Sequence, residues 1–391
     1  MGFLSMSGVS TGLATTAPGI PIGKWFKSFL WWATRSICSW CDWCFGLVSL
    51  LIGLAVLATI PVLQFLTLGY LLESGGRIAR SGRLRNGFIG IRQTSRIGSI
   101  ALGTWLLLWP ARFVSDVWYT SRLVDPDSLE TARWRLLLVV LTTVILIQIC
   151  WAWYRGGKLR HFFWPAPLRL KRELFRRGKY VRCRDAVWEF FASLRLGYYF
   201  YLGWRGFVGA VIWLFFPLLL FVGATLLPQP AGFFAGFVSV VLLIFVFSHL
   251  PFLQIHFAVE GKIAAMFEVQ RIRQLSRRSP LTFSFALTVT LLFALPLYLL
   301  KIELTPKEVF VLPSLIFVAF IFPARLLTGW ALSRAYRHQK DRHLVFRWMS
   351  RILGIAVVAA YILFVFFTRY TSWHGHWSLL EQHAFMVPVP F

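Results

Sequence analysis

Long apolar runs alternate along the chain with short polar segments that are mostly basic. A helix that crosses the hydrocarbon core of a bilayer needs roughly 20 apolar residues. Backbone polar groups must be satisfied within the segment in lipid, so each run is expected to be a helix. The sequence therefore predicts an all-α, polytopic membrane helical bundle of about eight transmembrane helices, with interfacial amphipathic helices beside them. The eight runs are 44–72, 97–118, 134–154, 207–227, 233–256, 281–300, 309–330 and 351–368.

The first run is ambiguous because Pro61 lies near its middle. A single tilted pass over 44–72 is the preferred interpretation. It places the N-terminus outside, although Lys24, Lys27 and Arg35 favour the inside. The alternative is a re-entrant hairpin bent at Pro61, in which each arm is too short to cross alone.

The remaining segments complete the predicted organisation. Residues 1–43 form an N-terminal tail and a Trp-rich helix over 25–43, which is too polar to span and is expected to lie in the interface. The first three transmembrane helices occupy 44–154. A basic segment, 155–206, is predicted to be an amphipathic cytoplasmic hairpin resting on the bilayer. The last five transmembrane helices then occupy 207–368, and an extracytoplasmic tail the rest, 369–391.

The composition agrees with a membrane protein. Charged residues make up 14% of the chain and hydrophobic residues 58%, whereas about a quarter of a soluble domain is charged. The net charge of +26 would suggest nucleic acid binding in a soluble protein. Here 29 of the 41 Lys and Arg residues lie in four alternate segments, 73–96, 155–206, 257–280 and 331–350. The charge thus predicts orientation, with these four loops in the cytoplasm and no nucleic acid partner.

Two segments carry a family resemblance. They are GYLLESGGRIARSGRLRNG, at 69–87, and FAVEGKIAAMFEVQRIRQLSRRSP, at 257–280. Both resemble the core of an uncharacterised bacterial membrane family, of the domain-of-unknown-function type common in planctomycetes. The resemblance covers about 46–300. It implies a helical bundle in the bacterial inner (cytoplasmic) membrane and carries no known activity, cofactor or catalytic residue.

Basic residues of two cytoplasmic loops are the candidate lipid site. The glycine-rich stretch from Gly75 to Gly90 is not a phosphate-binding P-loop, because Gly87 is followed by Phe88. Lys and Arg near a membrane surface attract anionic phospholipid headgroups. The lipid bilayer is therefore the expected partner, and other membrane proteins are candidate partners. The candidate headgroup residues are Arg77, Arg80, Arg83, Arg85, Lys171, Arg172, Arg176 and Arg177.

His249, His256 and Glu260 form a candidate polar site within the membrane. Their spacing of seven and four residues places them on one helical face. Ionisable groups at membrane depth are costly and often functional, which favours a proton or ion path. The alternative is that the histidines are buried and hydrogen-bonded.

Two further groups have the residue types of metal sites. Cys38, Cys41 and Cys44 have the C-x2-C-x2-C spacing of iron–sulfur ligands, but their thiols would fan apart on a helix and lack a fourth ligand. The tail 374–383 contains three histidines and a glutamate without an evident scaffold. We therefore predict no metal, no cofactor and no catalytic residue.

Two short motifs recur. Pro61-Val-Leu-Gln64 is echoed by Pro251-Phe-Leu-Gln254, and Trp109-Pro-Ala-Arg112 by Phe322-Pro-Ala-Arg325. Proline-interrupted helices at matching positions flank the site in many transporters. Proline near a helix end, with an arginine that reaches the interface, is also common in membrane helices.

Three functions are consistent with these patterns. The first is a non-enzymatic scaffold or envelope component that binds anionic lipid through its basic loops. The second is a transporter or permease with a site between the Pro61 and Pro251 helices. The third is a membrane-embedded, lipid-modifying enzyme that uses His249, His256 or Glu260. No Ser-His-Asp order or zinc-protease motif supports an enzyme.

Overall fold

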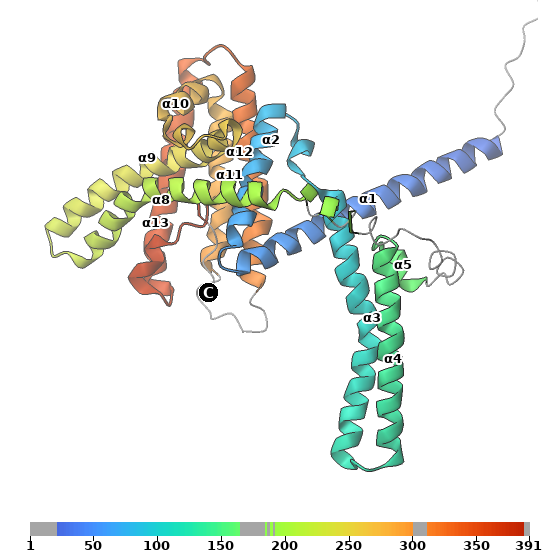
Figure 1. Ribbon diagram of the computed structural model, residues 1–391. Coiled ribbons are helices and arrows are strands. Elements are labelled where there is room, and N and C mark those ends of the chain that lie inside the picture. Colours follow the sequence, from blue (N-terminus) through green and yellow to red (C-terminus); the bar gives the residue numbers. More distant parts are fainter. Residues whose placement is uncertain (1–21, 165–183, 186–187, 191, 300–310, 387–391) are drawn as a thin grey trace, which may run out of the picture.

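The computed structural model describes residues 22–164, 184–185, 188–190, 192–299 and 311–386, with side chains from residue 31 onward. All regular structure in these ranges is helical, which confirms the all-α prediction (Figure 1). The long helices are α1 (Ile22–Thr59), α2 (Gln64–Ser81), α3 (Ile91–Val124), α4 (Leu129–Tyr154), α8 (Leu196–Leu226), α9 (Ala231–Glu260), α11 (Pro280–Leu299), α12 (Leu312–Arg337) and α13 (Leu344–Thr371). The shorter ones are η1 (Leu84–Gly87), α5 (Leu159–Phe163), η2 (Ile263–Phe267), α10 (Val269–Arg278) and η4 (Gly375–Leu380).

Eight of the described helices are long and apolar enough to cross a membrane, so the chain is a multi-pass membrane protein. They are α1, α3, α4, α8, α9, α11, α12 and α13. Seven of these correspond to runs predicted from the sequence. One of them, α8, begins at Leu196, eleven residues before the predicted start at 207. The aromatic stretch 198–204 is predicted from the sequence to be part of the cytoplasmic hairpin 155–206. It belongs to α8 instead.

The preferred single pass over 44–72 is wrong. Helix α1 ends at Thr59, and α2 begins at Gln64 after a tight turn in which Val62 has a φ of 73°. Pro61 lacks a backbone N–H and disfavours a helical conformation at the residue before it, so the helix stops there. The re-entrant alternative correctly predicts a bend at Pro61. Its first arm is not too short to cross, however, because 31–59 alone is long and apolar enough. The predicted interfacial helix 25–43 is the first half of α1.

Helix α2 lies at the centre of the bundle, packed against α8, α9, α12 and α1. Its glycines allow this. A Cβ added at Gly69 would lie 1.8 Å from the carbonyl oxygen of Tyr199 in α8, and one added at Gly203 would lie 1.9 Å from that of Phe65. On another face, Gly329 of α12 packs against the Gly75 backbone in the same way. Small residues let helix backbones touch in membranes, so these glycines act as packing positions.

The α3–α4 hairpin projects away from the main body (Figure 1). It is joined to the body through α1, where Gly46 packs against Ile91 and Gly98 packs against Ser49. The N-terminal half of α1 continues past this junction and is largely exposed from Trp31 to Trp43.

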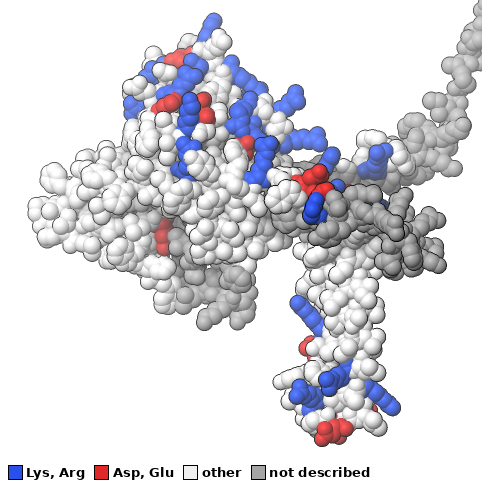
Figure 2. All heavy atoms as spheres, viewed as in Figure 1, with Lys and Arg blue, Asp and Glu red and all other residues white. Residues whose placement is uncertain are grey.

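The described parts of the four basic loops are joined to one another by hydrogen bonds. Arg337 donates to the Ser81 carbonyl over 2.8 Å, and Arg80 donates to the Ala258 carbonyl over 2.8 Å. The Arg342 N–H donates to the Arg277 carbonyl over 3.1 Å. The second loop is joined to the first because the Gln93 amide donates to the Ser193 hydroxyl. Figure 2 shows Lys and Arg gathered at one end of the body and a smaller charged group at the tip of α3 and α4.

The C-terminal segment folds back into the body. Residues 369–391 are predicted from the sequence to be an extracytoplasmic tail. The described part of this segment continues through η4 to Met386. Gln382, His383, Ala384 and Phe385 are each at most 2% exposed. The ring of Phe385 stacks on Phe247 with centroids 5.0 Å apart. This segment therefore forms part of the core.

Candidate anion-binding site

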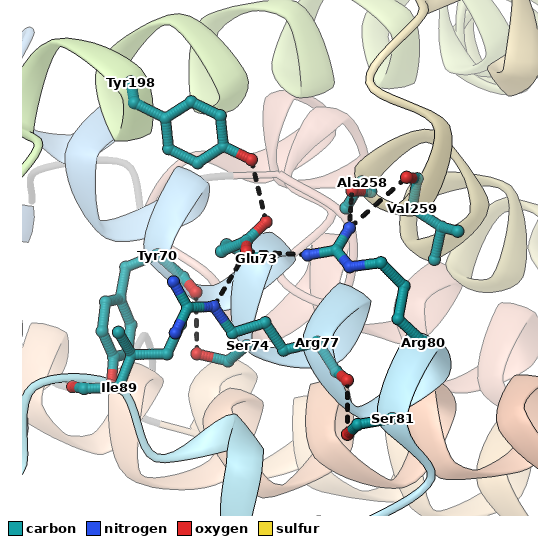
Figure 3. A network of polar contacts seen from close by, with 10 residues as sticks. All are labelled: Tyr70, Glu73, Ser74, Arg77, Arg80, Ser81, Ile89, Tyr198, Ala258 and Val259. Carbon is teal, nitrogen blue, oxygen red and sulfur yellow. Dashed lines mark hydrogen bonds and ion pairs between the residues drawn. The ribbon is translucent and has the colours of Figure 1, made fainter.

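Glu73 is the centre of a buried polar network at the basic end of α2 (Figure 3). The positions 73, 77 and 80 share one face of the helix, because residues three, four and seven apart lie above one another. Glu73 Oε1 accepts from Arg77 Nε at 3.0 Å and from Arg80 Nη2 at 2.8 Å. The Glu73 side chain is only 5% exposed, whereas the two arginines are 38% and 39% exposed. The buried carboxylate therefore holds two guanidinium groups whose other atoms reach solvent.

The network joins three helices. Tyr198 of α8 donates its hydroxyl to Glu73 Oε2 at 2.9 Å. Arg80 Nη1 donates to the Ala258 carbonyl at 2.8 Å and to that of Val259 at 3.4 Å, near the end of α9. The C-terminus of a helix carries a partial negative charge, which favours a cation there. These contacts fix both arginines, so little conformational freedom remains to be lost when an anion binds.

A pocket of about 510 Å³ opens beside this network. Arg77, Arg80 and Arg85 line it, and the backbone of η1 and the loop to α3 close its other side. Tyr70 anchors that loop by donating its hydroxyl to the Ile89 carbonyl at 3.0 Å. Three guanidinium groups line the pocket, and the one carboxylate, Glu73, pairs with two of them and does not itself line it, so the local charge is positive. The arrangement suits a phosphate or another oxyanion.

The predicted headgroup residues separate into three groups. Arg77, Arg80 and Arg85 converge on the pocket. Arg83 is exposed, does not line it, and stands immediately before η1. The other four, Lys171, Arg172, Arg176 and Arg177, lie outside the described residues. The sequence reasoning missed Glu73 and Tyr198. For Glu73 a signal was available, since it is the one acid among six arginines in 73–96.

The direct contacts of His256 and His249 are with residues other than those grouped with them in the predicted polar site. His256 Nε2 lies 3.1 Å from Glu268 Oε2, and its Nδ1 lies 2.7 Å from the Tyr336 hydroxyl. Glu260 is exposed at the end of α9. Gly261 ends that helix with a φ of 71°, which lets the chain turn back and bring Glu268 over His256. His256 is thus buried and hydrogen-bonded, as in the structural alternative.

His249 belongs to a different environment. Its Nδ1 lies 2.7 Å from the Phe245 carbonyl, one turn earlier on α9. It lines a cavity with Arg273 of α10 that neither His256 nor Glu260 reaches. His249 thus lines a different space from His256 and Glu260.

The second copies of the two recurring proline motifs lie together in the structure. Pro61 is exposed in the turn after α1, whereas Pro251 is buried. Gln254 and Arg325, which end the second copy of each motif, lie together in the core, with Arg325 Nη1 donating to Gln254 Oε1 at 2.7 Å. Arg112 is exposed on α3. The structure therefore joins the Pro251 and Pro323 helices, and the C-terminal segment fills the space beside them.

The candidate metal ligands have other surroundings. Cys38, Cys41 and Cys44 are free and exposed along α1. In the tail, His374 Nδ1 lies 3.3 Å from Glu381 Oε1, and His376 Nδ1 lies 3.1 Å from the Thr225 hydroxyl. Within the part of the chain that the structure describes, no three His, Cys, Asp or Glu side chains are grouped as metal ligands.

Comparison with family models, with curated proteins and with solved structures gives no match.

Proposed function

We propose that this protein is a non-enzymatic component of the bacterial inner membrane that binds anionic phospholipid headgroups on its basic side. The observation that supports this most directly is the convergence of Arg77, Arg80 and Arg85 on one pocket. Glu73 compensates one of these three charges and fixes two of the side chains. The pocket therefore offers a preorganised net positive site at the end of the bundle where the basic loops meet.

The same charges support a proposed orientation. Basic loops are retained in the cytoplasm, so the side that contains Gly82, Gly261 and the 338–343 loop is the cytoplasmic side. The cytoplasmic leaflet carries the anionic lipids, and each Lys or Arg near its surface contributes about 1 kcal/mol of attraction. A protein with this architecture gathers anionic lipid around itself and serves as a scaffold for the envelope.

Binding of headgroups can be tested with the full-length protein in a neutral detergent. The probe is fluorescent short-chain phosphatidylglycerol, compared with the phosphatidylcholine analogue. Arg85→Gln removes a lining charge and is expected to weaken phosphatidylglycerol binding about tenfold. Arg83→Gln is the matched control, because it removes the same charge two residues away without altering the pocket.

Two results would contradict the proposal. One is equal affinity for the two headgroups. The other is an equal loss in the two variants, which would show that only the overall charge of the loop matters. Salt should weaken the specific binding as well, because exposed charges are screened.

A further inference from the structure

A second cavity, of about 490 Å³, lies between α9, α10, α11 and α13. It is separate from the pocket at Glu73, which α2, η1 and the loop to α3 build. Arg273 and Arg277 line it from α10, where they are one helical turn apart and share a face. Arg351 lines it from α13. Polar or cationic residues from all four helices thus line one space.

The charge of this cavity is uncompensated. No Asp or Glu is among the residues that line it. Within the described residues, none of Arg273, Arg277 and Arg351 has a carboxylate partner. Arg273 lies over the ring of Phe245 at 5.5 Å, and Arg351 over that of Trp348 at 5.9 Å. Stacking on aromatic rings orients the guanidinium groups and leaves their charge in place.

A buried hydroxyl in the cavity lacks a partner. Ser284 of α11 is 4% exposed, and its Oγ makes no hydrogen bond. Buried polar atoms are nearly always hydrogen-bonded, so one that lines a cavity and has no partner points to a ligand atom there. The three other serines that line the cavity do have partners. Ser248, Ser276 and Ser350 donate to the carbonyls of Ile244, Arg273 and Pro280 at 2.6, 2.9 and 2.7 Å.

Part of the cavity lining is apolar. Leu287 of α11 and Gly354 and Ile355 of α13 line it. Ile355 follows Arg351 by one turn, so the lining changes from cationic to apolar over roughly 6 Å along the helix. Gly354 keeps this part open, because the nearest atom to an added Cβ would be Leu287 Cδ2 at 3.8 Å. A cavity lined by both cationic and apolar residues is complementary to an amphiphile.

We propose that this cavity binds one anionic amphiphile, with a phosphate or carboxylate headgroup and an acyl chain. The headgroup oxygens accept hydrogen bonds from Arg273, Arg277 and Arg351 and from the Ser284 hydroxyl. The acyl chain extends along Leu287 and Gly354. This site goes beyond the proposed headgroup binding at Arg85, because it holds a whole lipid molecule and uses none of the same residues.

The test uses the full-length protein in a neutral detergent and four probes. They are short-chain phosphatidylglycerol, the phosphatidylcholine analogue, a medium-chain fatty acid and inorganic phosphate. Arg273→Gln is expected to weaken phosphatidylglycerol binding about tenfold. Arg278→Gln is the matched control, because it removes a charge from the same helix outside the cavity lining and should leave the affinity unchanged.

A second variant separates the acyl chain from the headgroup. Gly354→Leu fills the apolar part and should weaken phosphatidylglycerol and fatty acid binding at least fivefold while leaving phosphate binding unchanged. Phosphate that binds as tightly as the lipids, in a manner insensitive to Gly354→Leu, would overturn the amphiphile and identify an inorganic anion site. Equal losses in Arg273→Gln and Arg278→Gln would overturn the site itself.

Two controls keep the outcomes interpretable. Thermal unfolding of every variant in detergent identifies those that fail to fold, and Ser284→Ala supplies a mild alternative that should weaken binding about threefold to tenfold. Arg85→Gln should leave this cavity intact. If only Arg273→Gln weakens lipid binding, the cavity is a lipid site and the pocket at Arg85 is not. If only Arg85→Gln weakens it, the reverse holds.

Discussion

Arg325 donates a hydrogen bond of 2.7 Å to Gln254, and both side chains are at most 1% exposed. The same two residues bind the C-terminal segment. Arg325 Nη2 donates to the Ala384 carbonyl at 3.1 Å, and Gln254 Nε2 donates to the Phe385 carbonyl at 2.8 Å. A guanidinium group and an amide thus hold a backbone segment that would otherwise have unpaired carbonyls inside the bundle.

Gln254→Leu should destabilise the protein by about 1–3 kcal/mol, because the buried guanidinium of Arg325 loses an acceptor. The double variant Arg325→Met, Gln254→Leu should cost less than the sum of the two single changes, since it removes the buried charge as well. Thermal unfolding in detergent measures both. A double variant as unstable as that sum would show that the two residues do not act as a pair.

The close contact of α2 with α8 gives a prediction about glycine. Gly69→Ala and Gly203→Ala should each destabilise the protein by about 1–3 kcal/mol, because the added methyl group meets a backbone carbonyl that cannot move aside. Gly223→Ala is the control within α8, since nothing lies within 4 Å of its added Cβ. It should be neutral or stabilise by up to about 1 kcal/mol. The experiment is the same unfolding assay, and equal effects at all three positions would refute the contact.

The orientation of α3 can be tested by labelling. Helix α3 has 34 residues, which is roughly 50 Å and enough to cross a bilayer. With the five native cysteines replaced, Leu84→Cys and Asp127→Cys should lie on opposite sides of the membrane. A membrane-impermeant maleimide added to intact cells should label only position 127. Labelling of position 84 alone would invert the proposed orientation, and labelling of both would contradict the crossing.

Two glycines with left-handed backbone conformations should differ in their tolerance of alanine. Gly82 has a φ of 70° and Gly261 a φ of 71°, so alanine costs about 1–2 kcal/mol of strain at either position. At Gly82 the methyl group would also displace the Arg337 guanidinium, which donates to the Ser81 carbonyl. Unfolding should therefore show a larger loss for Gly82→Ala than for Gly261→Ala, by about 1 kcal/mol. A reversed order would argue against the Arg337 contact.

The sequence predicts the helices well where the apolar run is long and uniform, as in α9 or α13. It fails at Pro61, because a window of mean hydropathy averages across a turn and joins the end of α1 to the start of α2. The site is predictable only in part. Arg77 and Arg80 are evident from the charge pattern, but the contact of Glu73 with Tyr198 joins residues 125 positions apart. Periodicity along one helix gives no information about such a partner.

Partners across a turn are equally hidden. Helical periodicity places Glu260 on the same face of α9 as His256. The chain reverses at Gly261, and it is Glu268 that contacts the histidine. The inward course of the C-terminal segment is likewise absent from local patterns, because it depends on Arg325 and Gln254, two residues of different helices.

The central position of α2 also sets an order of assembly during synthesis. Its glycine faces contact Gly203 and Gly329, which leave the ribosome long after Gly69 and Gly75. Until then the neighbours of α2 are α1, η1 and the loop to α3, and its charged end lacks Tyr198 and the end of α9. The first hairpin to be made is therefore among the last to be completed, when translation has passed Gly329.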